Sequence, residues 1–337
     1  MATRLTAARA VVVALLGWAA ATAADLDSFQ FLSPTVVLTT GERARLARGE
    51  TIVQSLSADP REVATFVASR TIADGDRLAA WVRAITALKQ GPGVLAIARF
   101  SNPPHLDDLA ALSLDDAEID ELTRCRPGAC SVKLSGAEIG VVQRAVSGRG
   151  SAAVGPVVVD ALRAIILARV ERYVGTTDGV PPALPGLVRR TPFLSARVPL
   201  LTSSLGHHRA PSSSTLERFL YWSKERYTGK AIITVSEVTL YRSTTAGDPE
   251  LLVASTQLFA THYADGALNL TMVLAGRDPS GRVTERYLAA LNRTEVDMLG
   301  GVLGPMKRWV AERNVRREAV ERLDDARRRI ESGPPPK

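Results

Sequence analysis

The sequence has few of the residues and motifs that enzymes commonly use. Only two cysteines and four histidines occur among its 337 residues, and aromatic residues make up 5%. It contains no Gly-x-Ser-x-Gly turn, no His-Glu-x-x-His helix and no Gly-x4-Gly-Lys loop, which are signatures of hydrolases, zinc proteases and nucleotide-binding proteins. We therefore predict no cofactor and no metal site, and we favour a protein that is not an enzyme.

The sequence has no long block of residues that carry the same charge. The chain has 42 basic and 35 acidic residues, with a net charge of +7. Residues 307–331 contain nine basic and six acidic residues, a mixture typical of a solvated helix face. Nucleic-acid binding would need a concentrated basic patch on a recognisable module, so we predict none. Weak contact between this C-terminal helix and anionic lipid headgroups is the alternative interpretation of its basic residues.

The longest uncharged segment near the N-terminus predicts export. Arg4 and Arg9 precede an apolar run over residues 10–20, and small residues follow it. This pattern is typical of a cleaved signal peptide over residues 1–24, and the run is short for a membrane anchor, which is the alternative. We expect a bacterial protein in the periplasm or outside the cell. Removal of the segment would leave a net charge of +5.

The second half of the chain predicts an antiparallel sheet closed by a helix. Residues 231–242, 251–274 and 282–292 are rich in β-branched and aromatic residues, with turn residues between them. A bend at 264–266 should divide the middle run into two strands, since 24 residues are too many for one. A helix from about residue 302 to 330 has apolar residues near helical spacing and can cover the sheet.

The first half adds strands and a helical insertion. We expect a short helix at 41–49, strands at 51–56, 63–72 and 94–100, and a helix from Asp74 or Asp76 to Lys89. Residues 103–214 form the insertion, with helices at 106–112, 114–122, 134–146 and 157–173, followed by a loop rich in proline. The expected domain covers residues 25–330, and residues 331–337 form a disordered tail.

This order of elements resembles the helix-grip fold of START lipid-transfer domains, plant pathogenesis-related ligand binders and polyketide cyclases. The resemblance covers about residues 50–100 and 219–330. It implies an α+β fold in which a curved antiparallel sheet wraps a long C-terminal helix and leaves an apolar cavity between them. The phrases Phe219-Leu-Tyr-Trp-Ser-Lys-Glu225, Ala260-Thr-His-Tyr263 and Leu288-Ala-Ala-Leu-Asn-Arg293 resemble an uncharacterised family of exported bacterial proteins, which implies no activity.

Our leading functional prediction is an exported carrier that binds an apolar or amphipathic ligand, such as a lipid, between sheet and helix. Burial of apolar surface would supply most of the affinity. The predicted ligand-lining residues are Leu268, Leu270, Met272, Tyr287, Met306 and Trp309. A structural or interaction protein of the cell envelope, with the helical insertion as its partner surface, is one alternative.

The other alternative is a cavity-based enzyme, of cyclase or hydrolase type, with His262 as the general base. His262 lies in a predicted strand near the bend. The alternative is a structural histidine whose hydrogen bonds are made within the sheet. His207 and His208 lie in a loop rich in proline and serine, and we expect them at the surface. Cys125 and Cys130 flank Pro127-Gly128, a tight-turn sequence, so they are predicted to form a disulfide in an oxidising compartment.

Overall fold

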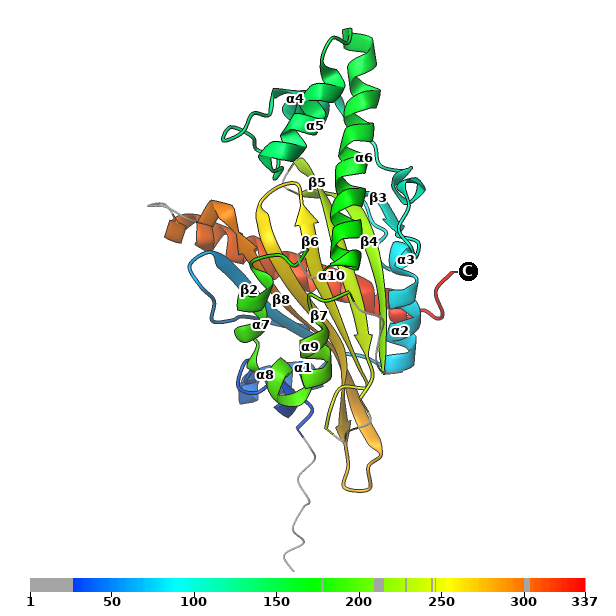
Figure 1. Cartoon of the computed structure of the whole chain (residues 1–337). Helices are drawn as coiled ribbons and strands as arrows, with labels where there is room; N and C mark the ends of the chain where they lie inside the picture. Colours follow the sequence, from blue (N-terminus) through cyan, green and yellow to red (C-terminus); the bar gives the residue numbers. More distant parts are fainter. Residues whose placement is uncertain are drawn as a thin grey trace, which may run out of the picture.

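The computed structural model describes residues 27–176, 179–208, 215–227, 229–243, 245, 247–299 and 304–336. The predicted signal peptide, residues 1–24, lies outside the described residues. The chain forms an α+β fold around one curved, open antiparallel sheet of eight strands, in the order β1-β2-β8-β7-β6-β5-β4-β3 (Figure 1). The predicted fold class is therefore confirmed at this level: a curved antiparallel sheet, a terminal helix and intervening helices.

The strands follow the predicted apolar runs with one addition. Their bounds are β1 (Ile52–Ser55), β2 (Glu62–Arg70), β3 (Val94–Arg99), β4 (Leu216–Tyr227), β5 (Lys230–Tyr241), β6 (Leu251–Ala260), β7 (Ala264–Arg277) and β8 (Val283–Val296). The middle run does divide, at residues 261–263, where Tyr263 has a φ of 62°.

Strand β4 was not predicted, and its sequence places charged residues among aromatic ones. The folded chain pairs those charges. Glu217 binds Arg83, Lys224 binds Glu118 and Glu225 binds Lys89. A buried charge is tolerated when it is paired and hydrogen-bonded, so β4 fits between β3 and β5.

The helices between β3 and β4 form the predicted insertion and one unpredicted group. The helices of the chain are α1 (Thr40–Ala47), α2 (Gly75–Arg83), α3 (Ile85–Leu88), α4 (Asp116–Arg124), α5 (Gly136–Val146), α6 (Ser151–Gly175), α7 (Leu184–Arg189), α8 (Pro192–Arg197), α9 (Pro199–Ser204) and α10 (Gly304–Glu331), with short 3-10 turns at η1 (Gln30–Leu32), η2 (Leu106–Leu109) and η3 (Asp297–Leu299). The proline-rich loop expected after α6 is wrong. Each of α7, α8 and α9 has a proline in its first two positions. The N–H groups of these positions have no partner within the helix, so a proline there removes no helix hydrogen bond.

One face of the sheet is covered by α2, α3 and α10. Helix α10 crosses this face (Figure 1). Trp81 Nε1 of α2 donates to the carbonyl of Gly333, just beyond the end of α10, at 2.8 Å. The buried apolar residues shared by this layer include Val67, Val238, Val273 and Leu288 of the strands and Leu78, Trp81, Leu323 and Ile330 of the helices.

The opposite face carries two separate apolar clusters. Helices α7–α9, with η1 and α1, pack over β2, β8, β7 and part of β6. Helices α4–α6 pack over β3, β4, β5 and the other end of β6, and extend beyond the end of the sheet (Figure 1). Both faces of the central strands are therefore filled by the chain's own side chains.

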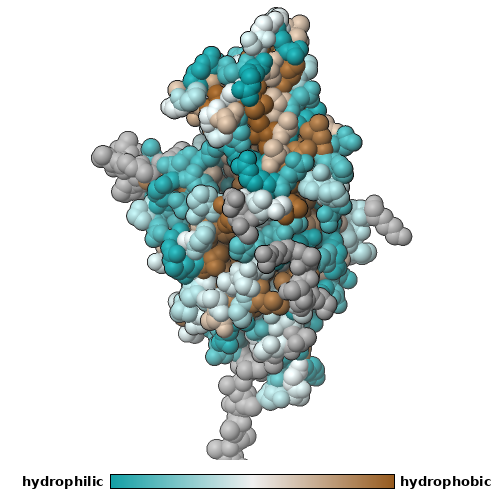
Figure 2. All heavy atoms as spheres, viewed as in Figure 1, coloured by the Kyte–Doolittle hydropathy of each residue, from teal (hydrophilic) through white to brown (hydrophobic). Residues whose placement is uncertain are grey.

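Among the described helices, α6 is long and apolar enough to cross a membrane by length and composition. In the folded chain it is tied to its neighbours by polar contacts. Arg163 donates to the carbonyls of Ala110 and Leu112, and Arg169 forms an ion pair with Glu138 at 2.6 Å. Leu162 and Ile166 are buried in the cluster with Trp222. Hydrophobic residues exposed on the viewed face gather along and beside this helix (Figure 2).

Candidate functional site

The predicted ligand-lining residues of β7 are core residues on the side of the sheet that faces away from α10. Leu268, Leu270 and Met272 each have no exposed surface. They pack with residues of α7–α9 such as Phe193 and Leu201, whereas Val273, of opposite parity, faces α10. Side chains alternate between the two faces along a strand, so these three residues cannot line a cavity beneath α10.

The remaining predicted ligand-lining residues lie elsewhere. Tyr287 is in the same cluster as Leu270, and its hydroxyl donates to Glu285 at 2.7 Å. Burial raises the pKa of Tyr287, and the hydrogen bond to Glu285 adds to this effect. Trp309 is on α10 but 63% exposed, and the side chain of Met306 lies outside the described part. The residues predicted to form one wall therefore belong to different surfaces.

An open pocket of about 490 Å³ lies at the foot of the helical insertion. Three chain segments enclose it: α4, the disulfide loop that follows α4, and the turn between β4 and β5. Its charged lining residues are Asp115, Glu118, Glu121, Arg124 and Lys230. Its volume lies in the range typical of small-molecule sites, but its lining is more polar than most.

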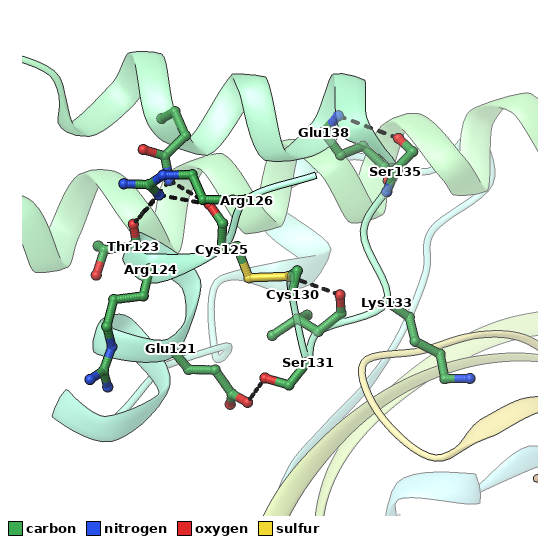
Figure 3. The surroundings of a disulfide bond; sticks show 12 residues. Glu121, Thr123, Arg124, Cys125, Arg126, Cys130, Ser131, Lys133, Ser135 and Glu138 are labelled. Carbon is green, nitrogen blue, oxygen red and sulfur yellow. Dashed lines mark hydrogen bonds between the residues drawn. A yellow bond between two sulfur atoms is a disulfide. The ribbon is translucent and has the colours of Figure 1, made fainter. Parts of the chain in front are cut away.

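Glu121 is the most highly connected side chain of this pocket. Its Oε1 accepts from Lys230 Nζ at 2.6 Å and from the Ser131 hydroxyl, and Figure 3 shows Glu121 reaching from α4 toward Ser131. Burial alone would raise the pKa of Glu121, but hydrogen bonds from Lys230 and Ser131 and the nearby positive charges lower it below its ordinary value. Glu121 is thus held as a carboxylate beside the open pocket.

His262 lies behind Glu121 and is 7% exposed. Its Nε2 is 3.3 Å from Glu121 Oε2, without the alignment of a good hydrogen bond, and its Nδ1 is 3.0 Å from the Thr261 hydroxyl. That hydroxyl also accepts from the N–H of Ile233 and is buried. Burial and the charge of Lys230 lower the pKa of His262, with Glu121 opposing. The imidazole is neutral and enclosed, which favours a supporting role over direct contact with a substrate.

The predicted disulfide forms one side of the pocket. Cys125 ends α4, and Cys130 lies across the turn with its Cα 4.5 Å away (Figure 3). Gln143 of α5 donates to the carbonyls of Thr123 and Cys125, at 3.0 and 3.1 Å. The bridge and this amide together fix the end of α4 and therefore the position of Glu121.

A second polar group was missed by sequence reasoning. Glu237 of β5 is 1% exposed. It lies on the face of the sheet that points away from α10, between the two apolar clusters. Its Oε1 lies 2.5 Å from His208 Nδ1, and its Oε2 accepts from the Tyr173 hydroxyl of α6 at 2.8 Å. Burial raises the pKa of Tyr173, and the charge of Glu237 raises it further. His208 was expected to be a surface loop residue, because its partner is 29 residues away in the sequence.

The buried Glu237 carboxylate fixes the orientation of the His208 ring through Nδ1. A carboxylate in this position favours the tautomer with hydrogen on Nδ1 and leaves Nε2 as an acceptor. The His208 side chain is 21% exposed, so this histidine is the more accessible of the two. The geometry is that of a carboxylate–imidazole pair used in acid–base chemistry.

Comparisons with known proteins identify no relative. No family model matches the chain, and no curated protein or solved structure matches it either. Among the residues that the structure describes, no group of three or more His, Cys, Asp and Glu side chains could hold a metal ion.

Proposed function

We propose that this chain is an exported binding protein that recognises a small polar ligand, bearing both a positive and a negative charge, in the pocket at the foot of α4. The observation that supports this proposal most directly is the lining. Acidic and basic side chains of α4 and the basic side chain of Lys230 border about 490 Å³ of open space. Export is proposed from the N-terminal pattern and is consistent with a disulfide beside the site.

The charges of the pocket suggest how such a ligand would bind. The Lys230 side chain is partly exposed beside Glu121, and Arg124 lies one turn further along α4, so both can meet an anionic group. Asp115 at the start of α4 exposes its carboxylate to a cationic group; its Oδ1 accepts from the N–H of Glu118. Free amino acids and the ends of short peptides have this combination of charges.

The carrier and helix-grip predictions remain proposals of lower rank. The curved sheet and the crossing of α10 support a helix-grip relationship. Against an apolar ligand beneath α10 stands the packing of Leu268, Leu270 and Met272 against α7–α9. A carrier function would therefore need a cavity built from other residues.

Titration calorimetry of the mature protein with free amino acids and dipeptides tests the polar-ligand proposal. The N-acetylated and C-amidated derivatives of the best binder each lack one charge, and each should bind at least about tenfold more weakly, because a charged partner in the pocket is then left unmatched. Lys230→Gln should weaken binding, whereas Arg282→Gln, which changes the same charge at an 81% exposed side chain outside the pocket, should not. Equal affinities for the charged and blocked compounds would contradict the proposal.

A second candidate function is acid–base catalysis by His208, and the Glu237–His208 contact favours it over catalysis by His262. In this proposal His208 Nε2 removes a proton from a substrate or water, and Glu237 stabilises the imidazolium that forms. The neighbouring His207 provides a matched control, because it is exposed and no side-chain contact is seen for it among the described residues.

A panel of chromogenic esters, phosphate esters and glycosides tests this second candidate. Where the wild type turns over a compound, His208→Ala should lower kcat by about 100-fold or more, and His207→Ala should leave it unchanged. Loss of activity in both variants to the same extent, or in His262→Ala alone, would assign the chemistry elsewhere. No turnover of any compound by the wild type would withdraw the candidate.

A further inference from the structure

The amino-terminal half of α10 exposes apolar side chains in an otherwise charged helix. Trp309 is 63% exposed and Val310 is 46% exposed. The other tryptophans of the described chain, Trp81 and Trp222, are 6% and 0% exposed. An exposed tryptophan beside an exposed valine costs free energy in water unless another surface covers both.

Basic side chains accompany these two residues along one stripe of the helix. Trp309, Arg313 and Arg317 are four residues apart, so they follow one another along a single face. The Arg313 guanidinium lies 5.8 Å from the centre of the Trp309 ring, and Lys307 is exposed one turn before Val310. Arg317 Nε lies 4.0 Å from Glu321 Oε1.

Other contacts of α10 hold the helix on the sheet. Leu323 and Ile330 are buried against the sheet. Arg308 donates to the backbone carbonyls of Asp59 and Glu62, at 2.8 and 2.6 Å, and pairs with Glu312. These contacts hold α10 on the sheet, while Trp309, Val310, Arg313 and Arg317 remain exposed.

We propose that this stripe, defined by Lys307, Trp309, Val310, Arg313 and Arg317, docks on an anionic lipid bilayer. Tryptophan rings prefer the boundary between headgroups and acyl chains, and each lysine or arginine near an anionic surface contributes about 1 kcal/mol of attraction. Charge complementarity selects the bilayer over an apolar protein groove, because three cations surround two apolar side chains. Trp309 then serves as an outward membrane contact, in place of the ligand-lining role predicted from the sequence.

Vesicle binding tests the proposal with the mature protein. Sonicated vesicles of phosphatidylcholine and phosphatidylglycerol in equal parts should bind the protein and shift its tryptophan emission to shorter wavelength, since Trp309 is the exposed tryptophan. Vesicles of phosphatidylcholine alone should bind at least about tenfold more weakly, and added salt should release the protein. Absence of binding to the anionic vesicles would overturn the proposal.

Matched charge reversals locate the contact. The double variant Arg313→Glu, Arg317→Glu should lower the vesicle partition coefficient at least about tenfold. Arg48→Glu, Arg282→Glu makes the same change in net charge at side chains that are 60% and 81% exposed, and should bind nearly as well as the wild type. Equal losses in both doubles would show attraction by net charge alone. A concentration-dependent emission shift without vesicles would assign the stripe to self-association, and either result would overturn the proposal.

Discussion

The centre of the sheet and its end beneath α4 use their side chains in opposite ways. At the centre, Leu270 and Val273 of β7 face opposite layers, and neither has exposed surface. At the end, Glu121 and Lys230 satisfy each other by an ion pair and remain beside about 490 Å³ of open space. A buried apolar side chain has no surface left to contact a ligand, whereas a paired charged side chain at a pocket can exchange its partner for a ligand group. We therefore look for ligand binding at the end of the sheet.

A large-to-small substitution at the centre gives the strongest test of this contrast. Leu270→Ala should lower the free energy of unfolding by about 2–5 kcal/mol, because it removes a buried side chain and leaves a cavity. Urea denaturation measures the change. Leu95→Ala on β3 is the control, since Leu95 is 44% exposed, and it should cost less than about 1 kcal/mol. A small loss at Leu270 together with a loss of bound lipid would instead restore the apolar-carrier prediction.

A buried charge on the α10 face should have the next largest effect. Glu225 of β4 is 6% exposed, and it pairs with Lys89 at 2.5 Å and with Arg322 at 3.4 Å. Burial alone would raise the pKa of Glu225, but the charges of Lys89 and Arg322 and the hydrogen bonds from Lys89 and Ser223 lower it to about 2.

The lowered pKa of Glu225 predicts how stability depends on pH. A carboxyl group with a folded-state pKa below its unfolded value stabilises the fold above the unfolded pKa, and this stabilisation is lost as the pH falls through the folded value. A decrease from 4.5 to about 2 corresponds to about 3 kcal/mol at neutral pH, lost between about pH 5 and pH 2. Glu225→Gln should remove that dependence and lower the free energy of unfolding at pH 7.

Glu217→Gln is the matched control on the same strand. Its side chain is 42% exposed in the pair with Arg83, and exposed pairs contribute at most about 1 kcal/mol. Chemical denaturation of both variants from pH 2 to pH 7 makes the comparison. Parallel stability curves for Glu225→Gln and the wild type would show that Glu225 does not produce the acid-sensitive part of the stability.

Local rules explain which parts of this fold could be read from the sequence. Ser135 and Glu138 form a capping box at the start of α5, which was predicted as a helix over residues 134–146, and Asp74 caps α2 as expected. The bend near residue 264 was predicted from chain length and turn residues. These features depend on residues within a few positions of one another, so one segment contains all the necessary information.

The parts that could not be read depend on partners distant in the sequence. The charged residues of β4 have their partners, Lys89 and Glu118, on other elements, which the sequence of the strand does not show. His208 looked like a loop residue because Glu237 meets it only in the folded chain. The face on which Leu270 lies was also undetermined, because alternation identifies two faces without saying which helix covers each.

The disulfide provides the smallest and most local test of the contrast between centre and end. Replacing Cys125 and Cys130 together by serine removes a bridge across a sequence separation of five. Loop-closure entropy for so short a loop predicts a loss of about 2 kcal/mol. The end of α4 should open more often, because only the amide of Gln143 and the side-chain contacts of α4, such as Glu121 with Lys230, would remain to hold it.

Hydrogen exchange measures where this loss occurs. Amides of residues 121–131 should exchange faster in the double variant, whereas those of β7 and β8 should stay protected, because the bridge contacts neither strand. Reduced wild-type protein should show the same pattern, which controls for the serine side chains. Faster exchange throughout the sheet would show that the end of the sheet and its centre unfold as one unit. The proposed contrast between a binding end and a packed centre would then be wrong.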